Sequence, residues 1–396
     1  MKNILSVALI AIFLTLCVSC GGNTAEINKK LEWFLKQHKS LKKDYYIGKF
    51  GIDNHPSGWD HGAYLSAYIN IYEATNDVRV LRALNELLKI VYNGNDSITK
   101  RVDDRTKTIL PGWGTREYEY GKDGKARYSD MLTNSLYAYP LAAFARIVKE
   151  DKKLQKEFGK DANIYYKMVV DLYKAHKPFK KAKDSPYKDK TIGLAFVYPK
   201  NWYDGEDNYS NIEAPINWTV IIAKPLIEIY KATKADKKDA SKYKDTLQKV
   251  ANYTWHNIKI KSKKGKKYLF WYYWPKDINL EQRDRPEDIT HGAKMAEFVN
   301  ALLSTDIKTI WSKKRAKLLA NTFIYGARID DTTFANYING SGGVYKDDAA
   351  TLYDWLEVNK FSDNKIYSIL NKAMQKEGQD ITYNLATFAK FVRFAK

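Results

Sequence analysis

The chain has 396 residues and a formal net charge of +20, from 66 Lys and Arg against 46 Asp and Glu. Its cysteines, Cys17 and Cys20, both lie within the first twenty residues. The rest of the chain therefore excludes a thiol nucleophile, a cysteine-based zinc site and an intrachain disulfide. Stability must come from a packed core, for which this length is ample.

Residues 1–20 have the pattern of an export signal. Lys2 supplies a short positive region, an apolar run extends from Ile4 to Leu16, and small residues precede Cys20. The run is too short for a permanent membrane span. The segment resembles a bacterial lipoprotein signal, in which Cys20 becomes the lipidated first residue and anchors the protein to the outer membrane, facing the periplasm or the cell surface. The alternative is an ordinary secretory signal that is cut nearby.

Helical periodicity accounts for most of residues 21–396, which contain no low-complexity stretch or linker and are predicted to form one domain. Helices are predicted at 29–38, 61–75, 77–93, 128–149, 153–176, 216–234, 240–257, 287–304, 308–327, 350–358, 362–376 and 381–395. Residues 258–274 alternate around a Lys-Lys-Gly-Lys-Lys turn instead, which predicts a small β-hairpin inserted among the helices.

The predicted helices arrive in pairs, with long connections at 94–127 and 177–212 and short connections between the members of a pair. This rhythm predicts an all-α fold, an (α/α) toroid or incomplete barrel of six or seven helical hairpins. Since no fixed-period repeat is present in the sequence, an α-solenoid is the alternative architecture.

The predicted inner helices begin with polar residues. Their starts are Gly58–Gly62, Arg127–Asp130, Glu213–Trp218 and Pro286–His291. A toroid places these N-termini on one rim beside the long loops, where the partial positive charge of helix N-termini attracts carboxylates. The residues predicted to bind substrate there are Trp59, His61, Trp113, Arg116, Tyr128, Trp274 and Glu287.

The stretch from Tyr268 to Met295 combines an aromatic strand, basic residues and a helix start. On the strand, the face of Leu269 and Trp271 is predicted to join the core, and the face of Tyr272 and Trp274 is predicted to be a sugar platform. The alternative is an ordinary aromatic core strand.

The positive charge, together with 30 Tyr and 10 Trp, favours a polyanionic partner that stacks on aromatic rings. For an exported protein this indicates an acidic polysaccharide rather than nucleic acid. We expect a monomer.

A uronic-acid polymer can be cleaved by β-elimination, which needs a neutralised substrate carboxylate, a base and an acid. Tyrosine can serve as base and acid when a nearby cation lowers its pKa from about 10. The predicted catalytic residues are Tyr272, with Tyr128 as the alternative tyrosine, and His291, Glu213, Asn217 and Arg285, with Arg116 as the alternative to Arg285.

Other interpretations stay open. Glu287 and Asp288 follow Pro286 in a first helical turn, where acidic residues are favoured without any catalytic role. Glu287 and His291 share a helix face, but no second such pair completes a metal site, so neither a metal nor another cofactor is expected. A glycoside hydrolase using Asp60 and Glu287 is the runner-up. A glycan-binding lipoprotein without catalysis is the third possibility.

A family resemblance rests on four features together. They are the lipoprotein start, the paired helices, the segment WYYWP at 271–275 and the helix start RPEDITHG at 285–292. The chain resembles the (α/α)-toroid polysaccharide lyases of Bacteroidetes, of the alginate and glucuronan lyase type known as polysaccharide lyase family 38. The resemblance implies elimination by a Tyr and a His, with an Asn, Arg or Glu that neutralises the substrate carboxylate. In better-known toroid lyases His precedes Tyr, whereas here His291 follows Tyr272, which leaves the identity of the base open.

Overall fold

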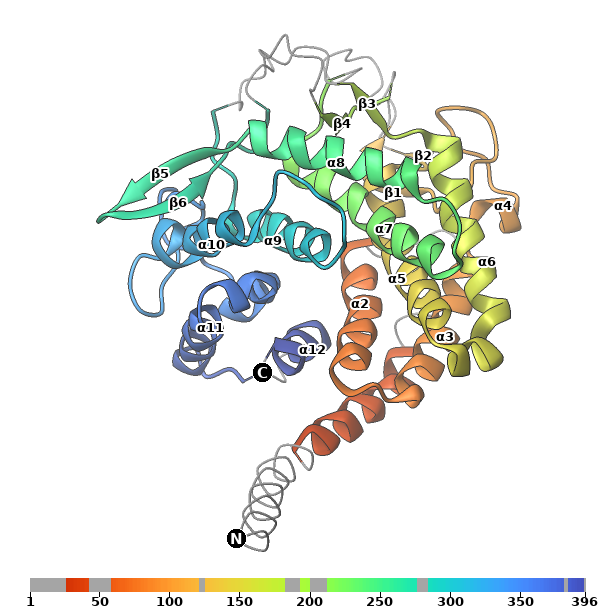
Figure 1. The fold of residues 1–396 in the computed structure, drawn as a ribbon, viewed down its shortest axis with the longest axis horizontal. Coiled ribbons are helices and arrows are strands. Elements are labelled where there is room, and N and C mark those ends of the chain that lie inside the picture. Colours follow the sequence, from red (N-terminus) through yellow and green to blue (C-terminus); the bar gives the residue numbers. More distant parts are fainter. Residues whose placement is uncertain are drawn as a thin grey trace, which may run out of the picture.

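A computed structural model of the chain describes residues 26–42, 58–120, 125–181, 193–199, 212–275, 284–380 and 384–394. Helices dominate these residues and the strands are few and short, which confirms the all-α prediction (Figure 1). The predicted signal, with Cys17 and Cys20, lies outside the described residues. Within those residues, no helix combines the length and apolar character needed to cross a membrane.

Except for a one-turn helix at 96–99 that the sequence did not predict, the helices lie within a few residues of the predicted ranges. After an N-terminal helix at 26–40 they are α2 Gly58–Thr75, α3 Val78–Asn93, α4 Asp96–Thr99, α5 Met131–Glu150, α6 Lys152–His176, α7 Ile216–Ala235, α8 Ser241–His256, α9 Ile289–Leu303, α10 Lys313–Asn321, the π-helical η3 Thr322–Ala327, the 3-10 helix η4 Ala349–Phe361, α11 Lys365–Lys376 and α12 Leu385–Phe394. The predicted single run at 308–327 is thus α10 continued by a π-helical turn.

The predicted β-hairpin is confirmed. Strands β5 (Lys259–Lys263) and β6 (Lys266–Phe270) pair antiparallel, and the turn residues Lys264 and Gly265 both have positive φ, as a tight hairpin turn requires. Strand β6 ends at Phe270, not at Trp274. The long connections also contain short antiparallel pairs that the sequence did not predict, β1 (Thr115–Tyr120) with β2 (Ala126–Tyr128) and β3 (Phe179–Lys181) with β4 (Leu194–Phe196).

One set of helices packs in an order that returns to its start. Helix α2 packs against α5, α5 against α7, α7 against α9, α9 against η4, η4 against α12, and α12 against α2 (Figure 1). These helices are apolar around most of their circumference. In α7, for example, nearly every residue from Ile216 to Thr233 is buried. A helix of this kind needs neighbours on several sides.

The second set consists of amphipathic helices packed against the first set. Helix α3 packs mainly on α2, α6 on α5, α8 on α7 and α11 on η4, whereas α10 packs on both η4 and α9. In α3, Leu84, Leu87, Leu88 and Val91 are buried along one face at helical spacing. The N-terminal helix packs on α12 through Trp33 and Phe388, whose ring centroids are 4.5 Å apart.

Ionic contacts reinforce the junction of α12 with its neighbours. Lys390 contacts Glu297 of α9 at 2.9 Å and Glu357 of η4 at 2.5 Å. Arg393 contacts Glu73 of α2 at 2.5 Å. Helix α12 is therefore held to α2, α9 and η4 by charge as well as by apolar packing.

Candidate active site

The segment after β6 is held beside the start of α9. The amide of Tyr273 donates to the carbonyl of Arg285 at 2.9 Å, and the amide of Glu287 donates to the carbonyl of Trp271 at 3.2 Å. The Tyr273 carbonyl accepts in turn from the amide of Ile216, the first residue of α7. These backbone bonds fix the aromatic segment against the first turns of two neighbouring helices.

Asp288 caps α9 and orients His291. One carboxylate oxygen, Oδ1, accepts from the amides of Thr290 at 3.1 Å and His291 at 2.8 Å, as an N-cap residue does. The other oxygen, Oδ2, lies 2.5 Å from Nδ1 of His291. Burial alone would raise the pKa of Asp288, but the hydrogen bonds and charge of His291, with help from Thr290, lower it to about 2.

The state of Asp288 determines which nitrogen of His291 is available. An ionised carboxylate can only accept a hydrogen bond, so Nδ1 of His291 carries the proton. In the neutral imidazole this leaves Nε2 as the basic nitrogen. The His291 side chain is 34% exposed, so a ligand can reach it.

Aromatic and cationic groups surround this pair. The ring centroid of His291 lies 5.7 Å from that of Trp59 and 6.1 Å from that of Tyr273. The guanidinium of Arg285 lies over the Tyr273 ring at 4.6 Å and 3.7 Å from Asp288. Flat rings and a guanidinium beside an oriented imidazole form a setting suited to an anionic sugar.

Tyr273 is protonated at neutral pH. Burial raises the pKa of its hydroxyl, with Glu287 adding to this and Arg285 opposing it. The side chains of Trp218 and Tyr273 are hydrogen bonded. Since an indole N–H can only donate, the Tyr273 oxygen accepts this bond and keeps its own proton to give away. Tyr273 is therefore better suited to act as an acid than as a base.

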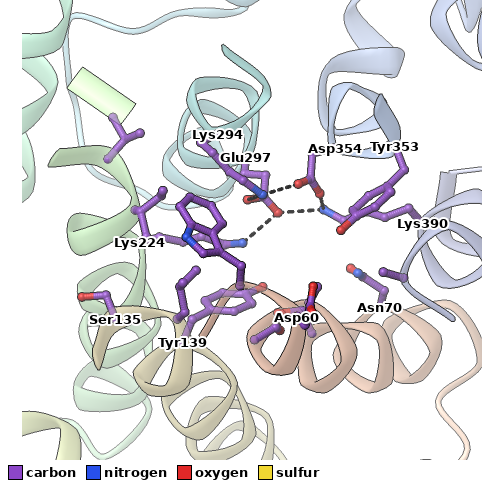
Figure 2. A pocket seen from close by; sticks show the side chains of 18 residues that line it. Asp60, Asn70, Ser135, Tyr139, Lys224, Lys294, Glu297, Tyr353, Asp354 and Lys390 are labelled. Atoms are coloured by element: carbon purple, nitrogen blue, oxygen red, sulfur yellow. Dashed lines mark hydrogen bonds and ion pairs between the residues drawn. The ribbon is translucent and has the colours of Figure 1, made fainter. Parts of the chain in front are cut away.

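A cavity of about 180 Å³ shares Trp59 with this group, and α2, α5, α7, α9, η4 and α12 all contribute to its wall (Figure 2). Because the Trp59 ring lines the cavity and also lies 5.7 Å from the His291 ring, the cavity lies beside the imidazole. The polar and aromatic residues labelled in Figure 2 are Asp60, Asn70, Ser135, Tyr139, Lys224, Lys294, Glu297, Tyr353, Asp354 and Lys390.

The charges inside the cavity largely neutralise one another. Glu297 is 2.9 Å from Lys224, 2.9 Å from Lys390 and 3.6 Å from Lys294. Burial would raise the pKa of Glu297, but these lysines hold it well below its usual range. Asp354 contacts Lys390 at 3.1 Å and also pairs with Lys294. The cavity is thus polar but carries little net charge.

Of the predicted site residues, the structure brings Trp59, Arg285 and His291 together. The predicted tyrosine, Tyr272, packs elsewhere, with its ring against Phe270 at 4.9 Å and its face toward Lys259 of the hairpin at 5.2 Å. Tyr273, from the strand face that was predicted to join the core, contacts His291 instead.

The other predicted residues lie in the core or elsewhere on the molecule. His61, Trp113, Tyr128, Asn217, Trp274 and Glu287 are all buried. Glu213 accepts a hydrogen bond from the Tyr253 hydroxyl at 2.8 Å, which ties it to α8, and the exposed Arg116 donates to the carbonyl of Lys125 in the β1–β2 hairpin. The six buried side chains are packed within the protein in this structure.

Glu287 shows most clearly how burial changes a predicted role. It is fully buried, and its Oε2 accepts from the indole N–H of Trp271 at 3.2 Å. Burial raises its pKa well above the usual value, with the charge of Asp288 adding to the effect. In this structure the Glu287 carboxyl group is enclosed by protein.

Within the described ranges, Glu287, Asp288 and His291 are the group whose ligand atoms lie close enough for a metal ion, all within 4.8 Å of one another. Asp288 and His291 already bind each other through Oδ2 and Nδ1, and Glu287 is enclosed behind Trp271. A metal would have to displace the Asp288–His291 hydrogen bond.

The sequence did not predict the role of Tyr273, the orienting role of Asp288 or the charged residues of the cavity. For the charged residues of the cavity, the sequence does contain a signal. Lys224, Glu297 and Lys390 each interrupt an almost wholly apolar helix, where a charged residue is rarely buried unless it is paired. For Tyr273 no local signal separates it from Tyr272.

Comparison with known proteins adds no relative. No protein-family model matches the chain, and neither a curated protein nor a solved structure is significantly similar to it.

Proposed function

We propose that this protein is a polysaccharide lyase that cleaves a uronic-acid polymer by β-elimination. The observation that carries the proposal is the Asp288–His291 pair, with Trp59, Tyr273 and Arg285 around it. This arrangement offers an oriented base, a protonated acid, a cation and a stacking surface within one small volume.

In the proposed reaction, Nε2 of His291 removes the proton on the carbon beside the uronate carboxylate. Arg285 stabilises the negative charge that develops on that carboxylate. The electron pair forms a carbon–carbon double bond and expels the glycosidic oxygen, which takes the proton of Tyr273. The Trp218 N–H and Arg285 then stabilise the resulting phenolate. The products are a new reducing end and an unsaturated uronate, and no water is consumed.

Two further features support the assignment. The packing order that returns from α12 to α2, with a second helix on the outside of each member, supports an (α/α) toroid of six pairs within the described residues. The sequence resemblance to family 38 polysaccharide lyases favours the same fold and reaction. We also propose that Cys20 carries a lipid that anchors the protein to the outer membrane.

The runner-up has less support. A hydrolase using Asp60 and Glu287 would need both carboxyl groups to reach the substrate, and Glu287 is fully buried. In the cavity, Glu297 and Asp354 are already paired with lysines. A glycan-binding protein without catalysis would use the same aromatic surface, so only an assay of products separates it from a lyase.

The test is to incubate the full-length protein with glucuronan, alginate and a neutral glucan, and to follow the ultraviolet absorbance of the unsaturated product. We expect absorbance to rise with a polyuronate and not with the glucan. His291→Ala should abolish the rise, and chelator treatment should leave it unchanged. New reducing ends without ultraviolet absorbance would instead establish a hydrolase. Binding without any product would establish a glycan-binding protein.

A further inference from the structure

A second cavity, of about 240 Å³, lies where the loop after α3 meets the end of α6 and the β3–β4 pair. Its charged or titratable lining residues are Arg105, His176, Lys177 and Lys180. No residue lines both this cavity and the one at His291. We call it the basic pocket.

The basic pocket differs from the cavity at His291 in its charge balance. Among the described residues no carboxylate lines it, whereas each lysine that lines the cavity beside His291 is paired with a buried acid. Asp103 acts on His176 through its charge, but it is already bonded to the amide of Ser129 at 2.7 Å and to Thr106. Within the described ranges, the positive charge of the basic pocket therefore has no matching carboxylate in its wall.

The cations of the basic pocket have no protein partners among the described residues. Nε of Arg105 is buried without a hydrogen bond, and neither its guanidinium nor the amines of Lys177 and Lys180 form an ion pair within the described ranges. His176 is fixed differently, with Nε2 donating to the carbonyl of Pro111 at 3.0 Å. A partly desolvated guanidinium without an acceptor is unfavourable, and an anion with two coplanar oxygens satisfies it best.

The remaining wall is apolar and the volume exceeds that of a small ion. Leu110, Met131 and Phe196 line the pocket together with the cations. A space of this size equals that of roughly eight water molecules at ~30 Å³ each. A carboxylate alone would leave most of it unfilled, whereas a single sugar ring would cover the apolar surface.

We propose that the basic pocket is a separate binding site for an acidic sugar unit. The carboxylate binds the fork of Arg105, with Lys177 and Lys180 adding attraction, and the ring lies against Phe196 and Leu110. The inference does not depend on catalysis at His291, because the two cavities share no residue. In an exported protein such a site would hold a polyuronate chain beyond the point of cleavage.

Met131 allows the site to be observed directly. It is 3% exposed and lines the basic pocket, whereas Met374 is buried in α11, which does not line it. In the full chain labelled with ¹³C-methyl methionine, D-glucuronate should shift the Met131 resonance and leave that of Met374 in place. D-glucose should shift neither, and the Met131→Leu variant assigns the signal.

The decisive variant is Arg105→Gln, with Lys107→Gln as the matched control. Lys107 is exposed two residues away and does not line the pocket. Arg105→Gln should weaken glucuronate binding, measured from the shift of the Met131 resonance, at least tenfold, because a charge-assisted hydrogen bond is lost. Lys107→Gln should change it less than twofold, and His291→Ala should leave it unaltered.

Three results would overturn the proposal. The first is a Met131 shift that persists at the same affinity in folded Arg105→Gln. The second is an equal loss in both Gln variants, which would reduce the effect to general charge. The third is sulfate binding as tightly as glucuronate, which would make the pocket an adventitious ion site only. If Arg105→Gln failed to fold, as judged by thermal melting, Lys177→Gln would take its place with an expected loss of several-fold.

Discussion

Replacing Lys390 by Met should destabilise the protein by breaking a buried ion network. The Lys390 side chain is 4% exposed, and its ammonium contacts Glu297 at 2.9 Å, Glu357 at 2.5 Å and Asp354 at 3.1 Å. Met fills similar volume, so the loss is one of charge rather than of packing. The carboxylates that remain would be buried with too few partners.

The size of the stability loss depends on which partners each carboxylate keeps after Lys390 is replaced. Glu297 keeps two lysines and Asp354 keeps Lys294, whereas Glu357 keeps Arg393 at 3.6 Å and the amide of Asn300. Breaking a buried pair costs about 3–5 kcal/mol, and the retained partners place this one near the lower limit. For 396 residues the unfolding entropy is about 0.8 kcal mol⁻¹ K⁻¹, so Tm should fall by about 4 °C.

The assay is thermal unfolding followed by circular dichroism across pH. Burial would raise the pKa values of Glu297 and Glu357, but the neighbouring cations lower both below the usual 4.5. A depressed carboxylate pKa stabilises the folded state above the unfolded-state value, and this contribution disappears as the pH falls through the folded-state value. The difference in Tm between wild type and Lys390→Met should therefore shrink below about pH 4.5.

Lys372→Met is the matched control. Lys372 lies 2.7 Å from Asp331, but their side chains are 60% and 73% exposed, so this pair should contribute nothing measurable. Adding Glu357→Gln to Lys390→Met should recover part of the lost stability, since it removes the carboxylate whose remaining cation, Arg393, is 3.6 Å away. Equal changes in Tm for Lys390→Met and Lys372→Met at pH 7 would refute a stabilising role of the buried ion network.

The remaining predictions concern the site and the anchor. Asp288→Asn keeps an oxygen that can cap α9 but loses the negative charge that fixes the His291 tautomer. Lyase turnover should therefore drop roughly 10²–10⁴-fold, with Tm nearly unchanged. Unaltered turnover would show that His291 is not the base. Tyr273→Phe should lose roughly 10²-fold while Tyr272→Phe retains activity, and the opposite order in a rate assay would return the role to Tyr272. Cys20→Ala should move the protein from the membrane to the soluble fraction, and persistent membrane association on fractionation would contradict a lipid anchor.

Local sequence patterns were sufficient to predict the long helices and the hairpin. The break between α2 and α3 falls at residues 76–77, close to the predicted ranges 61–75 and 77–93, because helical periodicity acts within a few residues. Asp77 caps α3. The Lys264-Gly265 turn is read from sequence for the same reason. That the aromatic strand leads to a helix start bearing His291 was also predicted, since both features are contiguous in the chain.

Which tyrosine reaches His291 could not be read from the strand. Alternation predicts sides only while a strand continues, and β6 ends at Phe270. Beyond that point the backbone of Tyr273 is fixed by Arg285 and by the first residue of α7, contacts that depend on how the helices pack. Burial of Glu287 and Asn217 is likewise a property of packed neighbours, because nothing in a first helical turn indicates what will cover it.

The sequence by itself thus determined the helical class, the hairpin and the polar start of α9, because short-range hydrogen bonding and periodicity encode them. Only the tertiary structure decided that Lys224, Glu297 and Lys390 meet in one cavity and that Arg105 and Lys180 meet in another. These groups lie on separate elements, and their contacts depend on long-range apolar packing. A charge that is unremarkable within its own helix becomes part of a site only when that packing removes it from water.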